Sequence, residues 1–187
     1  GVWTWRINYA YTAEENIVPW LLAGWWEPSH AADTRLLGLT VGRLLRAGQR
    51  MDLYARAAGY RHFERGLADD TWSVALSLMA MGHGHLPWSE RLAFRWGFGW
   101  GLSYALDVLA VERIKQANPG DRTNRLLGYL EWQVDVPVEL LFRSRWLQGC
   151  FVGGSVAHRS GIFGSASLFG KVSGGSDFVG LHVECLR

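Results

Sequence analysis

The sequence contains no long uninterrupted apolar run. Of its 187 residues, 49% are hydrophobic. No stretch, however, approaches the roughly 18–20 apolar residues that a membrane-spanning helix needs, because charges and glycines interrupt the richest segments. Strong charge is missing as well: the net charge is +2, and no basic cluster is present. The sequence therefore argues against helical membrane insertion and gives no electrostatic basis for binding nucleic acid.

Cysteine is scarce too, and this limits the chemistry available to the chain. Cys150 and Cys185 allow one disulfide and no zinc site. His83 and His85 share one face of a predicted strand, and a His-x-His pair can bind metal, but no third ligand is evident. We expect both histidines to fill the interior of the fold, and we expect neither a metal nor another cofactor.

Tryptophan and glycine, by contrast, are abundant. The chain has 11 Trp and 23 Gly. Tryptophan suits a membrane–water interface, because its ring is apolar while its N–H stays wet. Glycine within strands suits a crowded barrel interior. We expect Trp20, Trp25 and Trp26 near one interface, and Trp88 and Trp146 near the other.

Strict alternation of large and small side chains is the main structural signal. Between residues 92 and 106 the even positions are bulky and apolar, whereas the odd positions are mostly Gly, Ala or Ser with Arg95 among them. A row of bulky side chains such as Trp96 and Phe98 cannot fit inside a small barrel, but the small row can. The bulky row is therefore predicted to face lipid.

The same pattern recurs along the chain and predicts an all-β fold, an eight-stranded antiparallel transmembrane β-barrel. We predict strands near residues 2–11, 34–46, 51–63, 71–86, 91–107, 126–139, 150–161 and 177–187. Short and long connections alternate, as is usual for the periplasmic turns and external loops of outer-membrane barrels. We therefore expect residues 1–187 to form a single barrel domain in the bacterial outer membrane, with both termini periplasmic.

Two alternatives remain open at this stage. The apolar segment at residues 17–26 is placed in the first external loop, where it could act as a lid, but it could instead be a strand that replaces the one at residues 2–11. A soluble barrel with an apolar interior would place the Trp96 row inside and Arg95, Glu131 and Asp135 outside. Under the membrane reading, those charges fill the lumen.

Inward charges predict an ion-pair network rather than a pore. Eight-stranded barrels enclose side chains and leave no open channel. The inward positions of three predicted strands carry ionisable residues, both basic and acidic. We expect these to pair across the lumen: Arg91, Arg95, Glu131, Asp135, His182 and Glu184.

His158 and Ser160 carry the only spacing that resembles a catalytic site. Residues two apart project from the same side of a strand, roughly 6.5–7 Å apart, and a serine nucleophile needs a base within reach. Both share parity with Val152 and Val156, so they are predicted to face outward with these apolar residues. A polar pair on a lipid face is costly and calls for a functional reason.

The last hairpin suggests a register. If Cys150 lies opposite Cys185, the paired residue numbers sum to 150 + 185 = 335, and the residue opposite His158 is Asp177. The cysteines could form a disulfide in the oxidising periplasm, or they could be two unreacted lipid-facing residues. Glu184 is a weaker candidate acid, because its parity places it on the inward face.

These features resemble the outer-membrane lipid A 3-O-deacylases, which are PagL-like barrels. The resemblance is carried by the last 40 or so residues, with a His-x-Ser on the seventh strand and an acid near the start of the eighth. It implies an esterase in which Ser160 is the nucleophile, His158 the base and Asp177 the orienting acid. Where the family has Asn after the serine, this chain has Gly161, whose backbone N–H could hold the oxyanion. The family's acid is usually Glu rather than Asp.

These features support two alternative functions, each of which can be tested. The first is a membrane-embedded ester hydrolase acting on lipopolysaccharide (lipid A) or another outer-membrane lipid. The second is a non-catalytic barrel that binds lipid or an envelope protein partner, with His158, Ser160 and Asp177 as a polar cluster at its aqueous rim. The cations of residues 108–125 could hold lipid A phosphates, or they could belong to an ordinary solvated loop.

Overall fold

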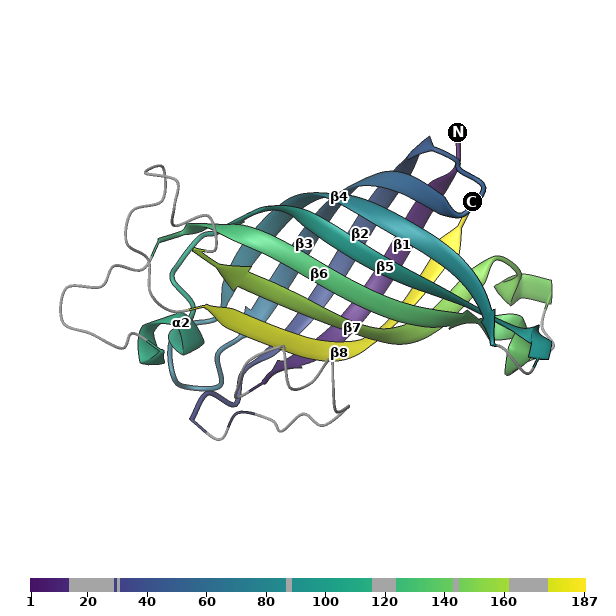
Figure 1. The fold of residues 1–187 in the computed structure, drawn as a ribbon. Coiled ribbons are helices and arrows are strands. Elements are labelled where there is room, and N and C mark those ends of the chain that lie inside the picture. Colours follow the sequence, from purple (N-terminus) through teal and green to yellow (C-terminus); the bar gives the residue numbers. More distant parts are fainter. Residues whose placement is uncertain (14–28, 30, 87–88, 116–123, 143–144, 162–174) are drawn as a thin grey trace.

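Eight antiparallel strands form a closed barrel in the computed structural model, which describes residues 1–13, 29, 31–86, 89–115, 124–142, 145–161 and 175–187 (Figure 1). Each strand pairs with its sequence neighbours, and the last strand pairs with the first. The strands are β1 (Trp3–Thr12), β2 (Arg35–Arg46), β3 (Met51–Phe63), β4 (Thr71–Leu86), β5 (Ser89–Ala105), β6 (Leu126–Pro137), β7 (Cys150–Ser160) and β8 (Ser176–Leu186). Short helices are α2 (Ala110–Ile114), η1 (Val138–Leu140) and η2 (Arg145–Leu147). The predicted fold class and all eight strands are confirmed.

Side chains alternate between the outside and the lumen as the sequence predicted. Trp96 is 42% exposed, whereas its neighbour Arg95 is only 4% exposed. Rows of large apolar side chains cover the outer surface, including those of Trp5, Leu76 and Trp100. The alternative of a soluble barrel with an apolar interior is therefore wrong. No helix among the described residues is long and apolar enough to cross a membrane.

Arg–aromatic pairs mark two levels on the outer surface. The Arg43 guanidinium lies 5.7 Å from the centre of the Trp3 ring, and that of Arg35 lies 5.8 Å from the centre of the Tyr11 ring. Trp3 and Tyr11 lie near opposite ends of β1. At about 3.3 Å per residue and a tilt near 40°, they are roughly 20 Å apart along the barrel axis, close to the height of an outer-membrane apolar band. Amphipathic side chains of this kind suit the two edges of such a band.

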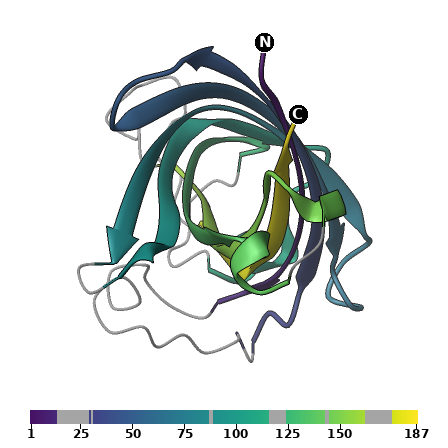
Figure 2. The same cartoon turned by 90° about the vertical axis from the view of Figure 1, so that its right-hand side faces the viewer.

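The two ends of the barrel differ. The termini lie at one end with the turns between β2 and β3 and between β6 and β7, while α2 lies at the other (Figures 1 and 2). We call these the termini end and the α2 end. Strand β1 pairs with both β2 and β8, so the alternative that left residues 2–11 out of the barrel is wrong. Residues 17–26 and Trp88 lie outside the described residues, whereas the exposed Trp146 belongs to η2 in the connection between β6 and β7, at the termini end.

An ion-pair network fills the lumen. Arg95 donates from Nε to Asp135 Oδ1 at 2.7 Å and from Nη2 to Glu184 Oε1 at 3.0 Å. Arg56 reaches the other Glu184 oxygen at 2.6 Å and is also an ion-pair partner of Glu131. The predicted network is therefore confirmed for the inward carboxylates, although the side chain of Arg91 lies outside the description. In the part of the lumen between these residues, three arginines face three carboxylates: Arg6, Arg56 and Arg95 against Glu131, Asp135 and Glu184.

His83 and His85 do not fill the interior as expected. They lie at the termini end of β4, and both side chains are exposed. His83 Nε2 is 3.0 Å from the carboxylate of Asp52 on β3. The parity of the two histidines is inward, but at this level the strand has already reached the mouth of the barrel, where solvent replaces the lumen.

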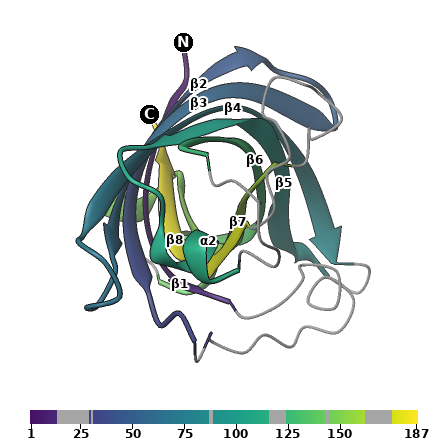
Figure 3. The same ribbon diagram turned by 90° about the vertical axis from the view of Figure 1, so that its left-hand side faces the viewer.

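Helix α2 lies at the mouth of the opposite end, over the part next to β7 and β8 (Figure 3). Leu109 and Val111 are buried and pack with Leu36, Tyr129 and Phe178 from the barrel wall. Below this apolar layer, the hydroxyls of Tyr60 and Tyr129 are 2.6 Å apart. Residues 108–125 were predicted to form a loop, because a five-residue helix is too short to show a helical period.

Candidate functional site

The register of the final hairpin is the one expected from the sequence. Cys150 pairs with Cys185, and His158 pairs with Asp177. A disulfide joins the two cysteines, whose Cα atoms are 4.0 Å apart. One constant index sum therefore holds along the whole β7–β8 ladder, without a bulge between the disulfide and the His–Asp pair.

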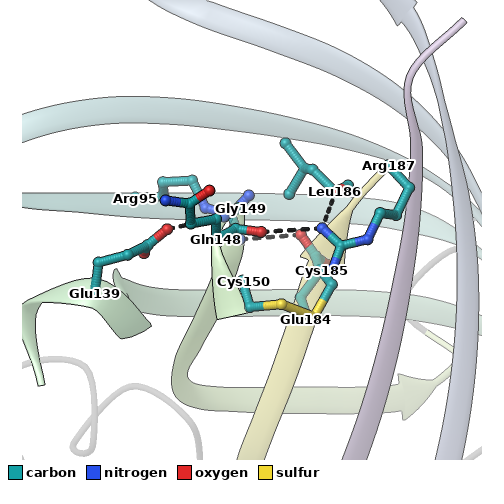
Figure 4. The surroundings of a disulfide bond; sticks show 9 residues. All are labelled: Arg95, Glu139, Gln148, Gly149, Cys150, Glu184, Cys185, Leu186 and Arg187. Carbon is teal, nitrogen blue, oxygen red and sulfur yellow. Dashed lines mark hydrogen bonds and ion pairs between the residues drawn. A yellow bond between two sulfur atoms is a disulfide. The ribbon is translucent and has the colours of Figure 1, made fainter. Parts of the chain in front are cut away.

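The turn before the disulfide is fastened to both neighbouring strand ends (Figure 4). The N–H of Gly149 donates to Glu139 Oε1 at 2.9 Å. Arg187 donates from Nη1 to the carbonyl oxygen of Gln148 at 3.0 Å. Gly149 has φ of +74°, a left-handed conformation that glycine adopts without a steric penalty. These contacts fix the start of β7 and so the height of every residue along it.

His158 and Asp177 form a close pair on the outward face. The distance from His158 Nδ1 to Asp177 Oδ1 is 2.6 Å. The side chains are largely shielded, with exposed fractions of 16% for His158 and 9% for Asp177. Because Nδ1 is engaged by the carboxylate, Nε2 is left to face a second group. This is the ring orientation that a histidine base adopts when a carboxylate positions it.

Ser160 lies on the same row of β7 but is not hydrogen-bonded to His158. Its Oγ is buried and has no hydrogen-bond partner among the residues that the structure describes. Gly175 lies against it, since a Cβ added there would come within 3.2 Å of the Ser160 Cβ. Gly161 directly follows β7, and its role in holding an oxyanion stays a prediction. The outward parity of all three side chains is as expected, and only the contact between serine and histidine is missing.

A buried apolar cluster lies beside the pair, toward the termini end. Val156 on β7 and Val179 on β8 are opposite one another and buried. They pack with Ala13, Tyr11 and Trp132. The outward-facing polar pair therefore borders a buried apolar cluster of the barrel wall.

Two residues near the pair were not assigned to it from the sequence. Lys115 Nζ lies 3.6 Å from Asp177 Oδ2. Glu112 Oε1 accepts from Arg159 Nη1 at 2.7 Å and from Ser176 Oγ at 2.9 Å. Both residues were noted only as members of a charged loop, and nothing in their spacing revealed that α2 carries them to β7 and β8.

Only some of the charged residues between 108 and 125 belong to an ordinary solvated loop. Arg113 is exposed, and Arg125 forms an exposed pair with Asp107 at 3.2 Å. Glu112, in contrast, is buried, and this burial raises the pKa of its carboxyl although the nearby Arg159 guanidinium acts in the opposite direction. Asp121 and Arg122 lie outside the described residues. Across the described ranges, no cluster of three or more His, Cys, Asp or Glu side chains is placed to hold a metal ion.

Comparison with known proteins identifies the architecture. No protein-family profile and no curated protein sequence matches the chain. Among solved structures, it is similar to the outer membrane enzyme PagL, with 12% identity, a TM-score of 0.55, and coverage of 97% of this chain and 98% of that one. It is also similar to Neisserial surface protein A (NspA), with 10% identity, a TM-score of 0.52, and coverage of 99% and 98%. At these identities the likeness concerns the fold, and the chain is accordingly an eight-stranded barrel of the outer-membrane type.

Proposed function

We propose that the protein is a membrane-embedded ester hydrolase that removes an acyl chain from lipid A or another outer-membrane lipid. The observation that carries the proposal is the 2.6 Å contact between His158 Nδ1 and Asp177 Oδ1 on the outward face, with Ser160 on the same row. Buried polar groups facing lipid are costly unless they serve a purpose. The fold shared with the outer membrane enzyme PagL adds support.

In the proposed reaction, Ser160 Oγ attacks the ester carbonyl carbon while its proton passes to His158 Nε2. Asp177 holds the imidazole through Nδ1 and stabilises the imidazolium that forms. The histidine then gives the proton to the departing alcohol, leaving an acyl group on Ser160. Water, deprotonated by the same imidazole, releases the fatty acid and restores the serine. The Gly161 N–H is our candidate donor to the oxyanion.

The missing bond between Ser160 and His158 does not oppose this scheme. Catalytic hydrogen bonds are often long in a substrate-free enzyme and tighten in the complex. Residues two apart on a strand are about 6.5–7 Å apart along it, and rotation about the side-chain bonds of both residues can close much of that gap. Ser160 Oγ has no partner among the described residues, so no hydrogen bond within that part of the chain must break for this contact to form.

The height of the pair selects the leaflet. We propose that the termini end is periplasmic, since short turns belong to that side in outer-membrane barrels. His158 then stands eight residues above Cys150 in β7, or roughly 20 Å toward the outside. At that level the pair meets the outer leaflet, where the ester bonds of lipopolysaccharide lie. We further propose that residues 1–187 act as one barrel domain.

The test is a Ser160→Ala variant compared with the native protein. Cells overproducing the native barrel should yield lipid A from which one acyl chain is missing in the mass spectrum, and the variant should not. Ser103→Ala is the matched control, because Ser103 is also a strand serine whose buried hydroxyl lacks a partner among the described residues, but it belongs to the inward row of β5. Lipid A that is the same with native protein and Ser160→Ala would refute the esterase.

A second function is favoured by one specific observation. Asp177 is already engaged by both His158 and Lys115, and Ser160 is not bonded to the histidine. Such a charged cluster at a barrel rim suits a non-catalytic protein that binds lipid or an envelope protein. In that case purified barrel would bind lipopolysaccharide, and the His158→Ala and Lys115→Ala variants would weaken binding while releasing no fatty acid.

A further inference from the structure

The short helix α2 contacts the β7–β8 hairpin from two sides. Glu112 lies in the lumen and binds Arg159 and Ser176, which are opposite one another on β7 and β8. Lys115, one residue beyond the end of the helix, reaches Asp177 on the outward face. Figure 3 shows α2 across the mouth of the barrel, next to the ends of these strands.

The two residues that hydrogen-bond to Glu112 are sequence neighbours of the proposed triad. Arg159 stands between His158 and Ser160, and Ser176 directly precedes Asp177. A single oxygen, Glu112 Oε1, receives both hydrogen bonds. It therefore ties β7 to β8 at the level where the imidazole must meet the carboxylate. In a strand, a shift of the backbone at one residue moves the side chains of both neighbours on the other face.

Lys115 acts on the other side of the same carboxylate. Asp177 presents Oδ1 to His158 at 2.6 Å and Oδ2 to Lys115 at 3.6 Å. With one oxygen held by each partner, the carboxylate plane is fixed relative to the imidazole. Lys115 is 28% exposed and Asp177 only 9%, so this contact is partly shielded from solvent.

The helix itself is anchored inside the barrel. Leu109 and Val111 are buried in the apolar layer of the mouth, and the N–H of Ala110 donates to Glu64 Oε2 at 3.2 Å. This packing includes Phe178 of β8, but it also includes Leu36 of β2 and Tyr129 of β6, so the position of α2 does not depend on the β7–β8 hairpin alone. A helix held in this way can impose its geometry on the site rather than follow it.

We infer that α2 is a positioning element for the His158–Asp177 pair, with Glu112 and Lys115 as its positioning residues. This inference rests on the proposed esterase for its effect on turnover. Its effect on the His158 imidazole, however, is independent of any activity.

The first experiment is a pH titration of His158 by NMR in detergent micelles, with the signal assigned through a His158→Gln variant. Lys115→Met removes a positive charge beside Asp177, so His158 becomes the only cationic partner of this carboxylate among the described residues. Because this favours the protonated imidazole, the His158 titration midpoint should rise by about half a pH unit. Arg113→Met is the matched control, since it removes an exposed cation from the same helix, and it should leave the midpoint unchanged. Equal midpoints in native protein and Lys115→Met would overturn the role of Lys115.

The second experiment separates Glu112 as an acceptor from Glu112 as a charge. Glu112→Gln can keep an oxygen in the place of Oε1, and the second carboxylate oxygen has no partner among the described residues, so this variant should stay within about threefold of the native kcat. Glu112→Met matches the volume but removes the acceptor, and it should lower kcat about tenfold or more with little change in KM. The same lipid substrate and detergent serve all variants.

Each failure has a distinct meaning. If native protein and Ser160→Ala are equally inactive, the esterase fails while the His158 titrations still decide the role of α2. If Glu112→Met folds and has native kcat and native His158 titration, α2 is only a plug and the inference is refuted. Should Glu112→Met not fold, Lys115→Met still decides, because its side chain contributes nothing to the buried layer.

Discussion

Asp135→Asn is the sharpest test of what holds the barrel together. Asp135 receives Nε and Nη2 of Arg95 at 2.7 and 3.0 Å, Nε2 of Gln133 at 2.7 Å, and Nε2 of His182 at 3.2 Å. Its side chain is completely buried and that of Arg95 nearly so. The substitution removes one of the three carboxylates that face Arg6, Arg56 and Arg95, and it replaces an acceptor oxygen with an N–H₂ group that faces donors.

The expected loss of unfolding free energy follows from the fact that the broken ion pair is buried. Removing one partner of a buried ion pair costs about 3–5 kcal/mol, because the other charge stays buried without compensation. Arg95 keeps Glu184 at 3.0 Å, so we expect the lower end of that range, about 3 kcal/mol of unfolding free energy. Neutralising the partner as well, in Arg95→Gln/Asp135→Asn, should recover about 2 kcal/mol relative to the sum of the single effects.

The assay is urea unfolding of the refolded barrel in detergent micelles, followed by tryptophan fluorescence. Asp107→Asn is the control, because Asp107 forms an exposed pair with Arg125 at 3.2 Å, and such surface pairs contribute less than about 1 kcal/mol. An Asp135→Asn effect no larger than that of Asp107→Asn would refute the view that lumen electrostatics stabilise this fold.

Three further predictions concern other parts of the wall. Replacing Cys150 and Cys185 by Ala opens a bond that spans 35 residues, and urea unfolding should show a loss of about 3–4 kcal/mol; equal stability of the variant and the native protein would contradict this. A Cβ on Gly153 would lie 2.0 Å from a backbone oxygen of β6, whereas one on Gly154 meets nothing closer than 3.8 Å. Gly153→Ala should therefore impair folding on a gel-shift assay while Gly154→Ala does not, and equal folding would be evidence against the close approach. Burial raises the pKa of Glu64 above its ordinary value of 4.5, so the native state keeps this proton to higher pH than the unfolded chain, and the contribution of Glu64 to stability falls as pH rises through that interval. Glu64→Gln should remove this dependence and slow amide exchange in α2 at neutral pH, and unchanged exchange would contradict it.

The strands, their faces and the last register were predictable because each rests on a local rule. Alternation with period two reports the face of a residue directly, and the volume of the Trp96 row decides which face is outside. Once Cys150 is set opposite Cys185, antiparallel pairing fixes the partner of His158 by arithmetic. These inferences need no knowledge of distant contacts, and the structure confirms them.

The residues that the sequence analysis missed depend on three-dimensional proximity. Arg56 was overlooked in the lumen network, because the outward row of β3 is built of small residues such as Ala57 and the parity of that strand is weak. Helix α2 has no periodic signal, so the contacts of Glu112 and Lys115 with β7 and β8 could not be foreseen. His83 had inward parity, and only the end of the lumen, which parity does not reveal, explains its exposure.

The alternation of outward and inward side chains along the strands also determines which substitutions the sequence tolerates. Most outward positions outside the His158–Asp177 site need only an apolar side chain, so Leu, Val, Ile, Phe and Trp can replace one another there at little cost. Lumen positions such as Arg95 and Asp135 can change without loss of stability only together, so that the buried charges remain paired. Such combined substitutions are rare, but different residue pairs can meet this condition. Sequences that obey both conditions can share this barrel fold with few identical residues, as this chain and the outer membrane enzyme PagL do at 12% identity and a TM-score of 0.55. For barrels of this size, the fold is therefore better recognised from parity and charge balance than from residue identity.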